Sequence, residues 1–407
     1  MTDLLLKHGP IFLINKIRRD ISTASYKITN RLSGINIAGY FQYVLGTGEA
    51  ARAFAKMIKR GNIPATLINL PAGFHPLLPK NESREFDIDL SRKAYFEKTL
   101  IFTNGNVLND IVPYFPELTQ SRYRAAVWWW EYEDGMEDCI KGFAHIDEVV
   151  VFSHFVKKAV ENILIPGKIV TKLRFPYWPN SKRPSNRELV LGKYGIRSDK
   201  MVFFFNFDFA SSIWRKNPKG ILSAFEKAFH KNDAVHLLFK TTNQEWFPEK
   251  SKEFKIILSS HPLNENITWI PKTLSQSEYN DLLGAIDCYI SLHRGEGLGL
   301  GLLESMHSGK PVIATNYGGN LEFTKPHNSM LVDYVLRPCN DDNVVYRHVT
   351  RCAEPDIEIA AQFMRELYEN PERRKTLGNQ ARNDILRQFN SDICLEEIKK
   401  WIAGKYR

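Results

Sequence analysis

The residues best suited to chemistry lie between Asp287 and Phe323, in the stretch DCYISLHRGEGLGLGLLESMHSGKPVIATNYGGNLEF. An apolar run at 288–292 leads into a segment with glycine at every second position from Gly295 to Gly301. A short helical pattern, a second buried-strand run and a second glycine-rich segment follow. This order predicts a parallel sheet whose loops gather at its carboxyl edge, where ligands of such sheets bind.

Glycine allows backbone to approach a ligand closely, and the helix that follows offers unpaired N–H groups that suit a phosphate or diphosphate. Two acids, Glu296 and Glu304, stand eight positions apart in this segment. A carboxylate on the phosphate itself would repel it, so the two acids are expected to accept hydrogen bonds from hydroxyls on either side. A sugar nucleotide has this distribution, with a diphosphate between two hydroxyl-bearing ends.

The segment EGLGLGLLESMHSGKPVIAT resembles the Glu-x7-Glu segment of retaining glycosyltransferases of family 4, which share the GT-B fold. The resemblance implies that Glu296 contacts the hydroxyls of the donor sugar and Glu304 those of the ribose. It places the neighbouring donor-binding loop at Gly297, Leu298, Gly299 and Leu300. It also implies a retaining, metal-independent hexosyltransferase that needs no cofactor. The donor would be a nucleotide diphosphate sugar, with GDP-mannose favoured because relatives often use it.

The stretch DFASSIWRKNPKGILSAFEKAF resembles the place where the family carries Arg and Lys five positions apart, both on the diphosphate. Lys216 falls on the Lys position, where a point charge at a helix start can reach a diphosphate. Ser211 falls on the Arg position and supplies no charge. Arg215 and Arg294 are the two candidates that could compensate for it.

The amino-terminal half opens with a strand, a glycine turn containing Gly46 and Gly48, a helix and a second strand. This βαβ unit resembles the GT-B loop that faces the donor across the cleft. Its spacing is not the full GxGxxG of a dinucleotide site.

Polar residues at later strand ends of this half are acceptor-side candidates: Asn104 and Asn106 after 100–103, and Trp130 and Glu131 at the end of 125–130. The WE pair and the segment DEVVVFSHF resemble a subgroup that builds bacterial surface polysaccharides by mannosyl-type transfer. The segment TNGN at 103–106 stands where many members of the family carry a histidine. His154 follows a later strand, and we expect it to have a structural role at a helix start.

A chain of 407 residues predicts two domains. We expect a basic arm at 1–34, a Rossmann-like acceptor domain at 35–178, a proline-rich linker, a Rossmann-like donor domain at 187–385, and a last helix at 386–407 that returns to the first domain. Beyond residue 333 the pattern predicts helices at 356–368, 371–377, 384–389 and 393–401.

The net charge is +9, but the basic residues are dispersed along the chain and no nucleic-acid-binding motif accompanies them. Nucleic acid is therefore not an expected partner. The arm carries six basic residues against two acidic ones, which suits an anionic membrane surface or an ordinary surface helix equally well. No run is apolar enough to span a bilayer, and the N-terminus does not have the pattern of a signal peptide, because Lys7 and His8 interrupt its apolar run. Five cysteines without CxxC spacing suit a reducing cytosol. We therefore expect a cytoplasmic protein that can be peripheral on the inner face of the membrane.

No histidines have metal-ligand spacing, and the Asp87-Ile88-Asp89 triplet sits in a charged stretch typical of a surface loop. The favoured function is therefore hexose transfer to a glycan or lipid-linked saccharide in surface polysaccharide synthesis. Alternatives are a GT-B nucleotide-sugar epimerase, a phosphorylase (for which no pyridoxal-phosphate lysine is marked), and a catalytically silent sugar-nucleotide-binding partner, which Ser211 keeps open.

Overall fold

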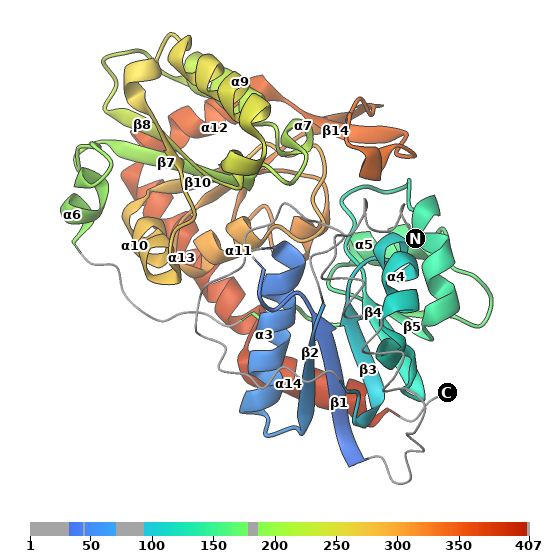
Figure 1. The fold of residues 1–407 in the computed structure, drawn as a ribbon. Coiled ribbons are helices and arrows are strands. Elements are labelled where there is room, and N and C mark those ends of the chain that lie inside the picture. Colours follow the sequence, from blue (N-terminus) through green and yellow to red (C-terminus); the bar gives the residue numbers. More distant parts are fainter. Residues whose placement is uncertain (1–31, 44, 71–92, 178–185, 405–407) are drawn as a thin grey trace.

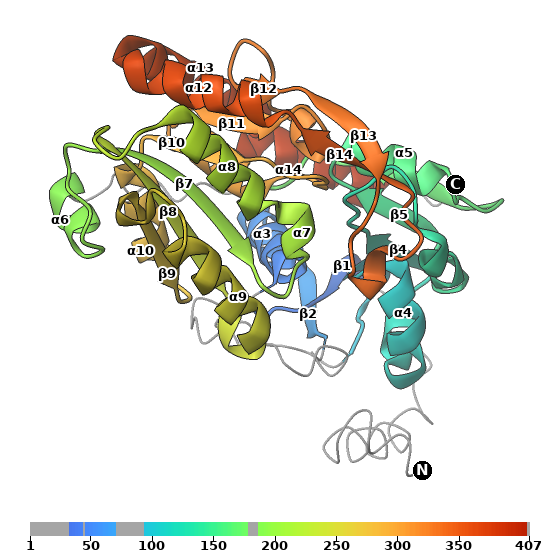
Figure 2. The ribbon, with the colours of Figure 1, turned by 90° about the horizontal axis from the view of Figure 1, so that it is seen from above.

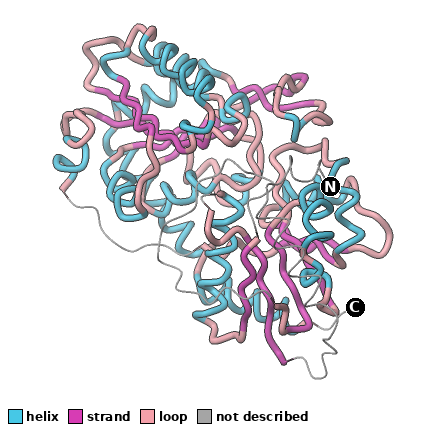
Figure 3. The backbone as a smooth tube through the Cα atoms, viewed as in Figure 1, coloured by secondary structure: helices cyan, strands magenta, loops and turns pink. Residues whose placement is uncertain are grey.

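The computed structural model describes residues 32–43, 45–70, 93–177 and 186–404. They form two α/β domains, each built on a six-stranded parallel sheet (Figure 1). The tube view shows the strands of the two sheets as separate groups, with loops filling the region between them (Figure 3). The predicted arm lies almost wholly outside the described residues, as do the Asp87–Asp89 triplet and residues 178–185 of the predicted linker.

The amino-terminal sheet has the order β2-β1-β3-β4-β5-β6. Its strands are β1 (Leu32–Gly39), β2 (Ala65–Asn69), β3 (Phe96–Phe102), β4 (Tyr123–Val127), β5 (Glu148–Val151) and β6 (Ile169–Lys172). Its main helices are α3 (Gly46–Arg60), α4 (Gly105–Ile111) and α5 (His154–Glu161). The chain adds β2 on one side of β1 and then β3 on the other side, so the strand order reverses between β1 and β3. Ligands of open parallel sheets bind at such a point.

The carboxy-terminal sheet has the order β12-β11-β10-β7-β8-β9. Its strands are β7 (Met201–Asp208), β8 (Val235–Thr242), β9 (Ile267–Pro271), β10 (Cys288–Ser291), β11 (Val312–Thr315) and β12 (Met330–Val332). The helices are α6 (Arg187–Gly192), α7 (Ile213–Lys216), α8 (Pro218–Ala228), α9 (Pro248–Ser259), α10 (Gln276–Ala285), α11 (Leu300–His307), α12 (Ile357–Glu369) and α13 (Pro371–Gln388). This is the strand order of the Rossmann fold, with its reversal between β7 and β10.

The central strand β7 reads MVFFFNFD because helices cover both faces of the sheet. Phe203, Phe204 and Phe205 are all buried, and Phe203 packs on Phe229 at the end of α8. The rigid core holds the carboxyl ends of β7 and β10 in place, and these ends carry the candidate site.

The last helix, α14 (Ser391–Ala403), crosses back to the first domain as expected. The indole Nε1 of Trp401 lies 3.1 Å from both carboxylate oxygens of Glu148, and the Lys98 ammonium donates to the Trp401 carbonyl at 2.7 Å. Near the start of α14, Arg60 of α3 pairs with Asp392. These contacts hold the last helix against the first domain.

A hairpin follows β12 where the sequence pattern predicted no strand. Strands β13 (Tyr334–Pro338) and β14 (Arg351–Pro355) pair antiparallel, and the turn segment 339–350 between them reaches the amino-terminal domain (Figure 2). Arg347 lies 2.5 Å from Asp138, and Thr350 donates to Asp134. The hairpin therefore bridges the two domains.

Two predicted boundaries are wrong. The helices expected at 371–377 and 384–389 are one continuous helix, α13. Gly378 does not end it: a Cβ there would lie 2.2 Å from the Gly309 carbonyl oxygen, so this glycine permits close packing of α13 on the loop after α11. The strand predicted at 125–130 ends at Val127, which leaves the three tryptophans 128–130 in the following loop.

Candidate active site

A cavity of about 460 Å³ lies between the two domains, where the reversal points of the two sheets face each other. From the first domain, the turn after β1 contributes Tyr40 and Gly46, and the end of β3 contributes Thr103 and Asn104. From the second, the loops after β7 and β10 contribute the opposite wall, including Lys216 and the glycine loop. The topology therefore assembles the site largely from the carboxyl ends of strands in both sheets.

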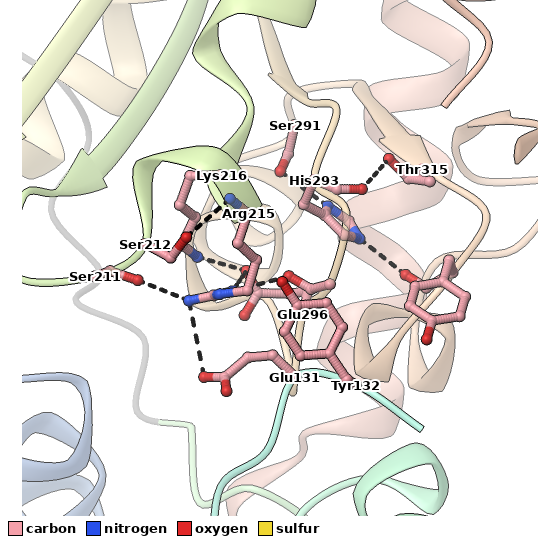
Figure 4. A network of polar contacts seen from close by, with 12 residues as sticks. Glu131, Tyr132, Ser211, Ser212, Arg215, Lys216, Ser291, His293, Glu296 and Thr315 are labelled. Carbon is pink, nitrogen blue, oxygen red and sulfur yellow. Dashed lines mark hydrogen bonds and ion pairs between the residues drawn. The ribbon is translucent and has the colours of Figure 1, made fainter. Parts of the chain in front are cut away.

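The short helix α7 brings Lys216 beside Glu296 (Figure 4). Its Nζ donates to Glu296 Oε2 at 2.6 Å, so the two residues that resemble the family's Lys and first Glu meet across 80 positions of sequence. Asn217 fixes this turn: it has a left-handed backbone, its Oδ1 accepts from the Gly220 amide, and its Nδ2 donates to the Leu292 carbonyl. Asparagine tolerates this backbone conformation better than most residues do.

Arg215 lies beneath Lys216 and is buried. Its guanidinium donates to the Gly295 carbonyl at 2.8 Å and to Ser211 Oγ at 2.7 Å, and it lies 3.8 Å from carboxylate oxygens of both Glu131 and Glu296. Ser211 thus orients the guanidinium of Arg215. Arg215 therefore contributes positive potential to the cavity, and its hydrogen bond to the Gly295 carbonyl holds the glycine loop in place.

Glu296 is ionised at neutral pH. Its burial opposes ionisation, but the charges of Lys216 and Arg215 outweigh burial and lower its pKa to about 2. A carboxylate in this state can accept hydrogen bonds from sugar hydroxyls and cannot donate a proton.

The glycine loop touches the first domain directly. A Cβ on Gly297 would lie 2.6 Å from the Trp130 carbonyl oxygen, and one on Gly295 would lie 2.5 Å from that of Glu131. Ser153, which caps α5, donates to the Gly297 carbonyl at 2.8 Å. Gly299 has a φ of +87° and precedes α11, a backbone conformation that favours glycine. The alternating glycines therefore serve domain contact as well as helix entry.

His293 supports this loop from inside. Its Nε2 donates to the Tyr317 carbonyl at 2.8 Å, and its Nδ1 lies 3.0 Å from Ser291 Oγ. Burial lowers its pKa, so the ring is neutral and acts as a brace between β10 and β11. The backbone carbonyl of His293 accepts from Thr315 on β11 (Figure 4).

Glu304 lies one helical turn into α11 and does not line the cavity wall. Its Oε2 accepts from the Tyr279 hydroxyl at 3.0 Å. Burial raises its pKa to about 7, and the Tyr279 hydrogen bond opposes that rise only in part. Glu49 of α3, in the other domain, raises it further, so Glu304 lies near the domain boundary.

This raised pKa predicts a pH-dependent stability. The folded protein holds the Glu304 proton more tightly than the unfolded chain does, so proton binding stabilises the fold below pH 4.5 and this contribution is lost as pH rises through about 7. Glu304→Gln keeps an acceptor for Tyr279 and never ionises. The melting temperature of the variant relative to the wild type should therefore be higher at about pH 8 than at about pH 5. Parallel melting temperatures over that range would contradict the assignment.

Most of the predicted donor residues line the cavity: Ser211, Arg215, Lys216, Glu296, Gly297, Leu298, Gly299, Leu300 and Gly46. Gly48 does not; a Cβ there would lie 2.6 Å from the Tyr40 carbonyl, so it is a packing residue. Arg294 is not brought to the cavity either. Its guanidinium forms a double contact with Glu354 at 2.6 and 2.9 Å and stacks on Trp214, so it cannot compensate for Ser211 at the diphosphate.

The acceptor-side candidates divide in the same way. Asn104 and Glu131 line the cavity, and Asn104 is locked to the Trp129 backbone by two hydrogen bonds. Trp130 is buried, with its indole donating to the Asp134 carbonyl, and Asn106 lies near Cys139 instead. Trp129 takes the place at the cavity that the sequence assigned to Trp130. His154 pairs with Glu322 across the domains, which agrees with a structural role.

Two cavity residues, Tyr346 and Lys240, were not among the predicted site residues. Tyr346 arrives on the hairpin turn, donates to Glu131 Oε2 at 2.9 Å, and has the Arg215 guanidinium 5.9 Å from its ring centroid. Lys240 lies inside strand β8, two residues before its end at Thr242. The sequence could have marked Lys240, because a lysine inside a largely apolar buried strand is unusual. The hairpin that carries Tyr346 has no comparable pattern.

Within residues 32–43, 45–70, 93–177 and 186–404, no three histidine, cysteine or acidic side chains cluster as a metal site would require. The same part of the chain contains no helix with the length and apolarity needed to cross a membrane.

The comparisons with known proteins bear on this geometry. Residues 193–384 match the family described as "Glycosyl transferases group 1", and they contain β7 through α12, with Lys216 and the whole glycine loop. The match therefore lies on the carboxy-terminal domain, on the side of the cavity that carries Lys216 and Glu296.

Solved structures share the architecture over nearly the full chain. A glycosyltransferase from Rickettsia africae ESF-5 is 17% identical, with 92% of this chain and 100% of that chain covered and a TM-score of 0.65. Anabaena HepE, in a crystal structure with UDP-glucose, is 12% identical, with 91% and 99% covered and a TM-score of 0.62. The two parallel sheets and these likenesses define a GT-B fold.

Among curated proteins, mouse alpha-1,3/1,6-mannosyltransferase ALG2 is 22% identical over 174 residues, or 42% of this chain. The match spans 37% of the mouse protein, so this chain covers well under half the length of that relative.

Proposed function

We propose that this protein is a retaining, metal-independent hexosyltransferase that uses a nucleotide diphosphate sugar and a glycan or lipid-linked saccharide acceptor. One observation carries the proposal: Lys216 and Glu296 are 2.6 Å apart on the wall of a cavity that both domains enclose. The sequence alone placed them 80 positions apart and assigned them to one donor.

In this proposal the donor lies along the carboxyl edge of the second sheet. Lys216 and the backbone amides at the start of α11 stabilise the diphosphate, whose charge grows as the bond to the sugar breaks. Glu296 accepts from hydroxyls of the transferred sugar, and Glu304 from the ribose. The acceptor enters beside Asn104 and Glu131, and positioning accounts for much of the rate.

Retention follows from departure and attack on one face of the sugar, so no protein nucleophile is needed. The acceptor hydroxyl forms the new bond to the anomeric carbon as the diphosphate leaves, and a phosphate oxygen takes its proton. The carboxylate of Glu296 is already paired with two cations, which makes it a hydroxyl acceptor and a poor nucleophile.

The donor sugar and base are proposed as mannose and guanosine diphosphate, in line with the mannosyltransferase relative. A UDP-linked hexose is the competing donor, because Anabaena HepE was solved with UDP-glucose. A role in surface polysaccharide synthesis, and attachment to an anionic membrane, extend the same proposal.

The test is incubation with GDP-mannose, UDP-glucose and UDP-N-acetylglucosamine, each with and without a panel of saccharide acceptors. Acceptor-dependent release of the nucleoside diphosphate, with an α-linked product, supports the proposal. An isomerised nucleotide sugar would replace it with the epimerase. Binding without turnover on every acceptor would favour a catalytically silent partner, for which Ser211 at the usual Arg position is the supporting observation.

A further inference from the structure

Lys240 is a charged side chain in an unusual place. It lies inside β8, two residues before the strand ends at Thr242, and all eight residues of that strand are buried. Its exposed fraction is 9%, and it lines the same interdomain cavity as Lys216 and Glu296. Lysines are rarely buried to this extent unless a partner compensates for the lost hydration of the ammonium.

No such partner is present in the described part of the chain. Three basic residues line the cavity, and two of them are engaged: Lys216 pairs with Glu296, and Arg215 binds the Gly295 carbonyl and Ser211. The Lys240 ammonium forms neither an ion pair nor a side-chain hydrogen bond with any residue that the structure describes.

The nearby acids do not satisfy it. Asp208, at the end of the neighbouring β7, accepts two hydrogen bonds from Asn243 and one from the Ala210 amide. Glu304 accepts from Tyr279. Burial lowers the pKa of Lys240 to about 8, and the charges of Asp208 and Glu304 offset this effect only in part. The ammonium is therefore present at neutral pH and available to an anion.

We propose that Lys240 is a second phosphate-binding cation of the donor site. This inference rests on the proposed function, because it assigns the anion to the diphosphate of the nucleotide sugar. It supplies the positive charge that Ser211 does not provide and that Arg294, bound to Glu354, cannot. The diphosphate thereby lies between Lys216 on α7 and Lys240 on β8.

A purely structural lysine would behave in the opposite way. If Lys240 served the fold, its replacement would destabilise the protein. An unpaired buried ammonium costs stability in the absence of ligand, so replacement by methionine, which is similar in length and apolar, should leave the melting temperature of the ligand-free protein at pH 7 unchanged or higher.

The experiment compares the full-length wild type with Lys240→Met by calorimetric titration of UDP, GDP, uridine and guanosine. For the diphosphate that the wild type binds, Lys240→Met should lower the affinity tenfold or more, while affinity for the matching nucleoside stays within about twofold. Lys219→Met is the matched control, because Lys219 is an exposed lysine paired with Glu253 outside the cavity, and it should bind as the wild type does.

Equal affinity of Lys240→Met and wild type for the diphosphate would overturn the inference while leaving the proposed function intact. Equal losses for nucleoside and diphosphate would also overturn it, since the lysine would then act on the base, the ribose or the fold. Failure of the wild type to bind either diphosphate would overturn both this inference and the proposed function.

Discussion

Glu296→Gln is expected to lower the rate of sugar transfer by about two orders of magnitude or more, with the affinity for the nucleoside diphosphate changed by less than about threefold. The substitution preserves size and removes the charge that Glu296 directs at the sugar. Lys216, released from its 2.6 Å contact, remains available to the phosphates. Two measurements on the same preparations check this: steady-state kinetics of sugar transfer, and titration of the protein with the nucleoside diphosphate.

A matched control exists on the surface. Glu253 also pairs with a lysine, Lys219, at 3.1 Å, and both side chains are about two-thirds exposed at 65%. Glu253→Gln should retain wild-type kinetics. Full activity of Glu296→Gln would remove Glu296 from the reaction, and a loss confined to nucleotide affinity would move it from the sugar to the nucleotide.

Gly297→Ala is the second change with a large expected effect. Its methyl group would lie 2.6 Å from the Trp130 carbonyl oxygen, so either the glycine loop or the first domain must move. Displacements of about 1 Å at a reacting centre cost on the order of 100-fold in rate. We expect a fall of this size in transfer, together with a lower melting temperature, measured by activity assay and thermal unfolding.

Gly192 provides the comparison, because it ends α6 on the surface and a Cβ there would meet no atom within 4 Å. Gly192→Ala should match the wild type in both measurements. If Gly297→Ala did so as well, the loop would not depend on contact with the first domain, and the closed arrangement of the cavity would not be required for activity.

The centre of the site could be predicted because it depends on local signals. Glycine spacing, strand ends and a helix start place Glu296 and the loop at one sheet edge, and the strand-order rule brings Lys216 to the same edge. These signals also predicted two sheets, whereas the returning last helix was expected from the resemblance to the GT-B fold. Glycine spacing, strand ends and helix starts are properties of short segments, and every parallel sheet brings its strand ends to one edge.

The parts that could not be predicted depend on contacts between distant segments. Arg294 looked equivalent to Arg215, but only the fold shows that Glu354 on β14 occupies its guanidinium. The hairpin that brings Tyr346 to Glu131 contacts partners in the other domain, such as Asp134 and Asp138, and its own sequence does not reveal those contacts.

Trp129 and Trp130 illustrate a smaller error with the same origin. Neighbouring residues point in different directions, and a shift of the strand end to Val127 decides which tryptophan faces the cavity. Element boundaries of this kind are set by how the loop packs on Gly295 and Gly297, which the sequence of β4 does not contain.

The most direct measurement is a crystal structure of the protein with the nucleoside diphosphate it binds. The account predicts the diphosphate in the interdomain cavity, within hydrogen-bond distance of Lys216 and of the amides at the start of α11, with the ribose hydroxyls toward Glu304. A nucleotide bound elsewhere, such as in the groove beside Trp214 and Lys250, would contradict it.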